Sequence, residues 1–288
     1  MIDRKVHMRF SLIIGTLNRH EEIKLCLESI SKQNFKDFEV VIVDQSKDEL
    51  TRNVVNESML KCIKYRKVEF KGLSRARNEA LKMSDGEFFC LIDDDAYYPE
   101  DYLYTLDSLI KTEPNNRIFS GYMWNSIINA SFVDYSKIKS GSVLSTREVI
   151  RYCPSPCITF PMRLKDEIGL FDEKFGVGST FGSCEETDYL LRALDVGYTV
   201  AYYDNLKIIH PHEKLKNSNY LELNPKKINS YALGFGALTR KHIDKFNVSI
   251  YYLETVLKDV AKIILKSPTY KYELKGHLKG FIQYKSMK

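Results

Sequence analysis

The sequence predicts an α/β protein with a Rossmann-like, mostly parallel sheet flanked by helices and a helical extension at its C-terminal end. Two observations support this fold class. Over the first hundred residues, short runs rich in Val, Ile, Leu and Phe alternate with segments of helical periodicity. These apolar runs are continuous rather than alternating with polar residues, which is typical of parallel strands that are covered on both faces.

The predicted elements follow one another in the order expected for such a sheet. Three apolar runs mark the strands, at 10–17 (FSLIIGTL), 38–46 (FEVVIVDQS) and 86–95 (GEFFCLIDDD). Segments 21–33 and 73–84 read as the helices between them. Segment 115–180 is less regular, and we expect loops and short strands there, laid over the edge of the sheet. A helix that starts in acidic residues and a strand that ends in a histidine follow it.

Composition excludes several classes of protein. Hydrophobic residues make up 44% and charged residues 28% of the 288, as in ordinary globular proteins. The N-terminus lacks the pattern of a secretory signal, and the longest apolar runs are too short to cross a bilayer. The six cysteines form no CxxC pair, so we expect reduced thiols in a cytoplasmic protein rather than a zinc site.

Polar residues stand where the predicted strands end. Thr16 and Asp44 close the first two strands, and Asp93, Asp94 and Asp95 follow the third. In open α/β sheets, ligands bind beyond the carboxyl ends of the strands. Carboxylates this close repel one another, so a cation is expected beside them, and oxygen ligands suit Mg²⁺ or Mn²⁺. The alternative is a solvated acidic turn that caps the following helix.

A second acidic group, Glu185, Glu186 and Asp188, opens the next predicted helix. The helix dipole alone favours carboxylates there, and a general base is the functional alternative. His210 ends the following strand and is either structural or a nitrogen ligand beside the metal. Trp124, the one tryptophan, either packs in the protein or stacks on a sugar or base.

Two phosphate-binding patterns are missing from the sequence. It contains no GxxxxGK[ST] loop, and the first strand runs into GTLNRHEE rather than GxGxxG. A P-loop phosphate site and a dinucleotide-binding site of the GxGxxG type are therefore not expected. Nor is a nucleic-acid partner, because the basic residues lack an interleaved aromatic platform.

Taken together, the motifs resemble the family 2 glycosyltransferases, which have the GT-A fold. The match runs in order over about residues 8–212, through SLIIGTLNRH, VVIVDQS, GLSRARNEAL, FFCLIDDDAYY and EETDYLLRALDVGYTV, and ends in KIIHPH. The resemblance implies an inverting transfer of a sugar from a nucleoside-diphosphate sugar, UDP-type, to an acceptor hydroxyl in bacterial-type polysaccharide or glycoconjugate synthesis. A nucleotidyltransferase and a non-catalytic nucleotide-sugar-binding protein on the same fold are the alternatives.

The resemblance also implies a role for individual residues. Those bordering the nucleotide sugar would be Thr16, Asn18, Arg19, Asp44, Arg75, Asn78, Asp93 and Asp94. Asp93, Asp95 and His210 would hold Mn²⁺ or Mg²⁺. Glu186 would be the base, with Glu185 and Asp188 as alternatives, and Trp124 is a weaker candidate for acceptor binding. Two positions depart from the family pattern: Gln45 replaces a second acid, and Glu185-Glu186 replaces the commoner Glu-Asp pair.

We divide the chain on this basis into a catalytic domain at 1–213 and a Lys-rich helical segment at 214–288. The nucleotide-sugar half of the catalytic domain would span 1–113 and the acceptor half 114–213. Residues 241–288 contain ten lysines against four acidic residues, and 251–266 form an amphipathic helix. Two alternatives stay open for this helix. It contacts the inner face of the plasma membrane, which would carry a lipid-linked saccharide acceptor, or it packs on its own domain.

Overall fold

The computed structural model describes residues 8–131, 133–211, 225–265 and 270–285, and a single sheet lies at its centre. The strands are β1 (Met8–Thr16), β2 (Phe38–Asp44), β3 (Ile63–Lys67), β4 (Gly86–Leu91), β5 (Arg117–Asn125), β6 (Ala130–Ser131), β7 (Ile158–Pro161) and β8 (Thr199–Ile209). Their order is β3-β2-β1-β4-β7-β5-β6, with β8 also paired to β5. The start of the predicted Lys-rich segment, 214–224, lies outside the described residues.

The N-terminal half of the sheet is parallel, as the sequence predicts. β1 pairs in parallel with β2 and β4, and β2 with β3, so that Thr16 stands opposite Asp44 in the register. β2 is buried along its whole length, which explains its continuous run of apolar residues. The carboxyl ends of these strands therefore meet at one edge of the sheet.

The expectation for segment 115–180 is wrong in one respect. β5 and β7 do not lie over the sheet edge; they are strands of the main sheet, and β7 runs antiparallel between β4 and β5. Ile158 and Phe160 of β7 are fully buried or nearly so. A strand of four residues that ends in a proline has too little periodicity to be recognised, and its neighbours in the sheet decide its conformation.

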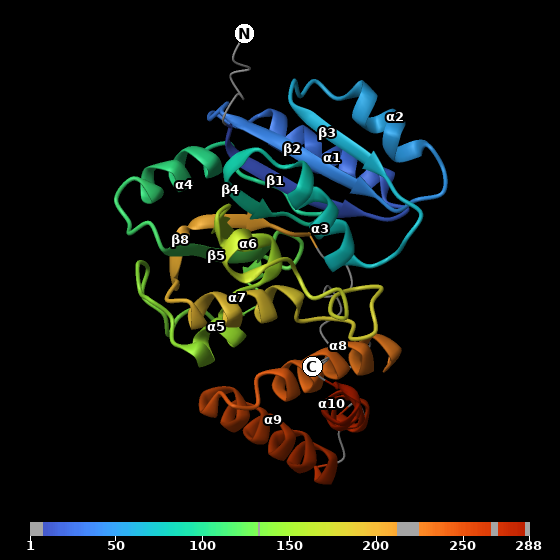
Figure 1. Ribbon diagram of the computed structural model, residues 1–288, viewed down its shortest axis with the longest axis vertical. Coiled ribbons are helices and arrows are strands. Elements are labelled where there is room, and N and C mark those ends of the chain that lie inside the picture. Colours follow the sequence, from blue (N-terminus) through green and yellow to red (C-terminus); the bar gives the residue numbers. More distant parts are fainter. Residues whose placement is uncertain (1–7, 132, 212–224, 266–269, 286–288) are drawn as a thin grey trace.

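Helices cover both faces of the sheet (Figure 1). One apolar core joins the sheet to α1 (His20–Ser31), α2 (Leu50–Glu57) and α4 (Tyr102–Ile110). The other joins it to α3 (Leu73–Met83), α5 (Thr146–Tyr152), α6 (Leu164–Ile168) and α7 (Glu185–Asp195). A short 3₁₀ turn, η1 (Ser155–Cys157), leads into β7. The predicted mostly parallel sheet with helices on both sides is thus confirmed.

Three C-terminal helices gather at the end of the molecule opposite β1–β3 (Figure 1). They are α8 (Pro225–Lys241), α9 (Phe246–Ile264) and α10 (Tyr270–Gln283). α8 and α10 cross closely through glycines, since a Cβ on Gly236 or Gly280 would run into backbone atoms of the other helix. Within the described residues, no helix combines the length and apolar character needed to span a bilayer.

Candidate active site

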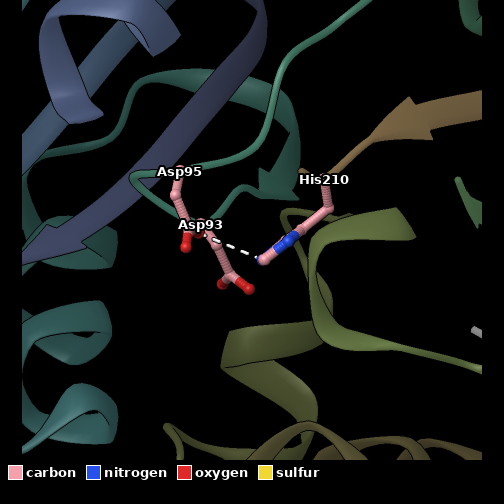
Figure 2. A group of neighbouring side chains, drawn as sticks. All are labelled: Asp93, Asp95 and His210. Atoms are coloured by element: carbon pink, nitrogen blue, oxygen red, sulfur yellow. Dashed lines mark ion pairs between the residues drawn. The ribbon is translucent and has the colours of Figure 1, made fainter. Parts of the chain in front are cut away.

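The acidic turn after β4 faces the end of β8. Figure 2 shows Asp93 and Asp95 pointing toward His210, which follows the last residue of β8. His210 Nε2 lies 3.1 Å from Asp95 Oδ1, and each of the three residues offers a ligand atom within 4.8 Å of the others. The sheet brings them together because β8 pairs with β5, and because Tyr97, just past the acidic turn, bridges to Ile209.

The donor atoms of this group fit a hard or borderline divalent cation. Two carboxylates and one imidazole form the mixed oxygen and nitrogen set that Mn²⁺ accepts, and Mg²⁺ uses the carboxylate part. All three side chains stay partly accessible, with exposed side-chain fractions of 31% for Asp93, 18% for Asp95 and 11% for His210. A cation held there would keep open positions for the phosphates of a substrate.

Arg19 and the hydroxyl of Thr16 hold the middle of the turn. Arg19 contacts Asp94 through Nη1 at 2.9 Å and Asp95 through Nη2 at 2.5 Å, and the Thr16 hydroxyl donates to Asp94 Oδ2 at 2.7 Å. Burial raises the pKa of Asp94 to about 7 against the opposing charge of Arg19. Burial acts in the same direction on Asp95, but the hydrogen bond and charge of His210, with those of Arg19, hold its pKa well below the ordinary range.

Asp44 lies at the end of β2 with its carboxylate already engaged. It is fully buried, and it accepts from the Tyr65 hydroxyl at 2.7 Å and from the Ser46 backbone N–H at 2.8 Å. Ser46 Oγ in turn accepts from the backbone N–H of Asn18, which has a positive φ of 56°. The predicted nucleotide residues at the ends of β1 and β2 are therefore joined into one hydrogen-bonded corner.

Helix α3 supplies two predicted residues with different surroundings. Arg75 is half-exposed, and its guanidinium lies 4.0 Å from the centre of the Phe70 ring. Asn78 is buried, and its amide bonds both to the carbonyl and to the N–H of Phe171. In this structure Asn78 anchors the segment around Phe171, and contact of either residue with a nucleotide stays a prediction.

Sequence reasoning missed Arg77, which is 1% exposed and connects the two acidic groups. Its guanidinium donates to Glu185 at 2.8 Å and to Ser155 Oγ at 2.5 Å, and lies 3.5 Å from Asp93. A buried guanidinium needs such partners, because an unpaired buried charge is costly. The available signal was its position on the same helical face as the buried Ala80 and Leu81.

The acidic start of α7 holds three carboxylates in three environments. Glu185 is 5% exposed and bonded to Arg77. Glu186 is half-buried, and no cation in the described ranges forms an ion pair with it. Burial, followed by the negative charge of Glu185, raises the pKa of Glu186 to about 8. Cys184, directly before the pair, has a left-handed φ of 70°, a conformation that the surrounding structure must impose.

Asp188 is fully buried and serves as an anchor. Arg192 lies 3.0 Å away, Lys241 2.8 Å and His242 2.9 Å. Burial would raise its pKa, but the hydrogen bond from His242 and the charges of Lys241 and Arg192 hold it at about 2. Asp188 thus fastens α7 to the end of α8, and its contacts with two cations and the imidazole of His242 make it a poor proton acceptor.

Trp124 lies at the end of β5, and its carbonyl accepts from the backbone N–H of His210 at 2.8 Å. Its ring packs edge-on against Tyr122, and Lys207 Nζ lies 4.6 Å from the ring centre. An open depression of about 530 Å³ adjoins this face, lined by Tyr122, Ser131, Val133, Asp134, Tyr135, Tyr202 and Asp204. The strand end beside the metal-ligand cluster therefore continues into an aromatic and acidic surface.

The profile of the family Glycosyl transferase family 2 matches residues 11–163, which is more than half of the chain and includes the acidic turn. The chain belongs to this family. A relative from Escherichia coli, UDP-Glc:alpha-D-GlcNAc-diphosphoundecaprenol beta-1,3-glucosyltransferase WfaP, is 29% identical over 152 residues. That match covers 52% of this chain and 58% of the relative, so the chain is compared with only part of WfaP.

Solved structures of other glycosyltransferases share the fold. S. aureus TarS 1–349 in complex with UDP-GlcNAc superposes with a TM-score of 0.60 at 21% identity, over 79% of this chain and 66% of TarS 1–349. The mannosyltransferase PcManGT from Pyrobaculum calidifontis, in complex with GDP-Man and Mn²⁺, gives a TM-score of 0.66 at 15% identity, over 96% of this chain and 87% of PcManGT. The predicted GT-A fold is confirmed.

Proposed function

We propose that this glycosyltransferase moves a sugar from a nucleoside-diphosphate sugar, UDP-type, to a hydroxyl of a saccharide or lipid-linked saccharide, with inversion at the transferred carbon. The observation that carries the proposal is the cluster of Asp93, Asp95 and His210 at the carboxyl ends of the strands. The UDP-linked donor in the name of WfaP and the UDP-GlcNAc bound to TarS favour a UDP-sugar.

Asp93, Asp95 and His210 would hold Mn²⁺ or Mg²⁺, which when bound offsets the charge of the leaving diphosphate. The Mn²⁺ in the PcManGT complex supports this choice. Asp95 now shares its carboxylate between Arg19 and His210. On loading, Arg19 would keep its contact with Asp94 and present its remaining donors to the nucleotide side.

Glu186 is our choice for the base that removes the proton of the acceptor hydroxyl. Its two acidic neighbours are committed to structural contacts, Glu185 to Arg77 and Asp188 to Arg192, Lys241 and His242. Arg77 then acts as a positioning residue, because it fixes Glu185 beside Glu186 and reaches toward Asp93. Inversion requires base and leaving group on opposite faces of the sugar, and the acidic start of α7 and the turn after β4 supply the two sides.

The acceptor would approach along the surface that begins at Trp124. Aromatic rings and carboxylates, such as Tyr122, Tyr202 and Asp204 there, are the groups that stack on sugar rings and bond to hydroxyls. We place the reaction in the cytoplasm, in bacterial-type polysaccharide or glycoconjugate synthesis, in line with the lipid-linked acceptor in the name of WfaP.

A thermal-shift screen with UDP-, GDP- and dTDP-sugars, each with and without Mn²⁺, tests the proposal. We expect the UDP-sugars to raise Tm only with the metal, and the protein to release UDP slowly from the donor without acceptor. Asp95→Asn should abolish the Mn²⁺-dependent shift, whereas Asp101→Asn, an exposed acid six residues on, should keep it. Donor binding without any UDP release indicates a non-catalytic binding protein, and no shift with any nucleotide sugar overturns the proposal.

A further inference from the structure

Helix α9 carries a row of apolar side chains that face solvent along its whole length. This α9 apolar row consists of Phe246, Ile250, Leu253, Leu257, Val260 and Ile264, with exposed fractions from 36% at Ile250 to 75% at Phe246. The spacing of four and three residues puts all six on one face of the helix. At 1.5 Å per residue the row is about 27 Å long. Such a continuous exposed row calls for a partner.

The opposite face of α9 is fixed to the protein, so the row cannot turn inward. Asp259 is 2% exposed and lies 2.7 Å from Nδ1 of the buried His277 on α10. Tyr252 donates to the carbonyl of His277 at 3.0 Å. On a third side, Arg147 of α5 forms an ion pair with Glu254. The row therefore stays exposed in the folded protein.

Charge on the two outer helices is positive on the exposed side. Lys258 and Lys262 of α9 are exposed, as are three lysines of α10, Lys271, Lys275 and Lys279. The acids of these helices are paired or partly buried: Asp259 is paired with His277, the 40% exposed Glu254 with Arg147, and Glu273 is half-buried. Asp244, in the turn before α9, is exposed. The lysines outnumber it, and their attraction is to an anionic surface.

We propose that α9 lies flat on an anionic lipid bilayer, with the α9 apolar row in the headgroup region and its lysines at the phosphates. An apolar face bordered by lysines is the pattern of a helix that binds in the membrane interface. A second copy of the chain fits less well. Helices that pair with each other carry complementary charges beside the apolar row. The one charged residue at these flanking positions of α9 is Glu254, and it is already paired with Arg147; the others are Asn247, Ser249, Val256, Ala261 and Ile263.

Docking of α9 would position the loop that leads into α7 and Glu186, because α8 contacts this loop. Ser183, two residues before Glu185, donates through Oγ to the carbonyl of Tyr231 on α8 at 2.9 Å. A Cβ on Gly234 would run into Ser183, so the two segments touch closely. The proposed membrane contact does not depend on the proposed function, whereas its use in reaching a lipid-linked acceptor rests on that function.

Vesicle co-sedimentation of the full chain tests the proposal, with phosphatidylcholine vesicles that contain or lack phosphatidylglycerol. We expect binding to the anionic vesicles only. The triple substitution Leu253→Ser, Leu257→Ser and Ile264→Ser should lower binding at least tenfold. The matched control, Leu25→Ser, Leu50→Ser and Met59→Ser, removes the same number of exposed apolar side chains from the region of α1 and α2 and should bind like the wild type. Circular dichroism melting checks that both variants fold.

Lys258→Gln and Lys262→Gln supply a second measure, since each should lower binding to anionic vesicles about fivefold. Equal binding of the wild type and the row variant overturns the proposal, as does failure of the wild type to sediment with anionic vesicles. A concentration-dependent dimer in light scattering that the row variant loses, without vesicle binding, would assign the row to a second copy instead. Donor binding measured without vesicles is independent of all these outcomes and reports on the proposed function alone.

Discussion

Glu186 differs from its acidic neighbours because no cation among the described residues forms an ion pair with it. Replacing it with Gln keeps the shape and removes the proton acceptor. We expect kcat to fall by about 10²–10⁴-fold, the usual contribution of a general base, with donor affinity largely unchanged. Turnover assays and donor titration measure the two effects. Transfer by Glu186→Gln at the wild-type rate would exclude Glu186 as the base.

The pH dependence separates Glu186 from Glu185. Because the pKa of Glu186 is raised to about 8, its base form gains population as the pH rises, and kcat/KM of the wild type should rise with pH until about 8. Glu185→Gln removes the neighbouring negative charge and leaves the positive charge of Arg77 without its ion-pair partner. Both effects lower the pKa of Glu186. The rising limb should therefore move to lower pH. A variant that is inactive at every pH would point to Glu185 as the base.

How far single residues can be predicted depends on how local their signal is. Thr16, Asp44 and the acidic turn could be placed together, because parallel strands end at one edge and each end is visible in its own segment. The ion pair of Arg77 and Glu185 joins residues 108 positions apart, and the local sequence around one residue does not predict the other as its partner. The same holds for Asp188, whose partners lie on α8 as well as on its own helix.

Among the elements, α8 and α10 depend on glycine for their close contact. A Cβ on Gly280 would run into the carbonyl oxygen of Leu233. In an isolated helix Gly→Ala is favourable by about 1 kcal/mol, whereas overpacking costs about 1–3 kcal/mol. Since the obstacle is backbone, the cost should prevail, and Gly280→Ala should lower the free energy of unfolding in urea. Lys279→Ala, at the exposed neighbouring position, should change it by less than about 0.5 kcal/mol.

If Gly280→Ala proves as stable as the wild type, the close crossing of α8 and α10 is wrong.

Helix α9 shows the limit of prediction from sequence patterns at the scale of elements. Periodicity predicts that 251–266 is an amphipathic helix, but it cannot say whether the apolar side faces the protein. Here the polar Asp259 and the aromatic Tyr252 make the inward contacts, and Leu253 and Leu257 point outward.

At the scale of the whole molecule, buried side chains join the C-terminal helices to helix α7. Asp188 links α7, which begins with the proposed base, to Lys241 and His242 at the end of α8. The sequence suggests a boundary near 213, where composition turns Lys-rich, and this division stays a prediction. Removing the segment would nevertheless leave the buried Asp188 with Arg192 alone, so we treat the C-terminal helices as part of what holds the site in shape.

Asp188→Asn measures this link. Loss of the carboxylate leaves His242 without its buried partner and Lys241 with Asp172 alone, and removing one member of such a network costs about 3–5 kcal/mol in the free energy of unfolding at pH 7. The folded-state pKa of about 2 lies below the unfolded value of about 3.9, so the carboxylate stabilises the protein above about pH 4. That contribution, about 2.6 kcal/mol by linkage, is lost as the pH falls toward 2.

The difference in stability between the wild type and Asp188→Asn should therefore narrow below about pH 4, which urea unfolding at a series of pH values would show. Asp195→Asn is the matched control on the same helix, because Asp195 pairs with Lys245 at the surface, and an exposed pair contributes about 0–1 kcal/mol. Where Asp188→Asn is still folded, it should keep transfer within about tenfold of the wild type, unlike Glu186→Gln. An Asp188→Asn protein that is fully stable but inactive would reverse the two roles and make Asp188 the base.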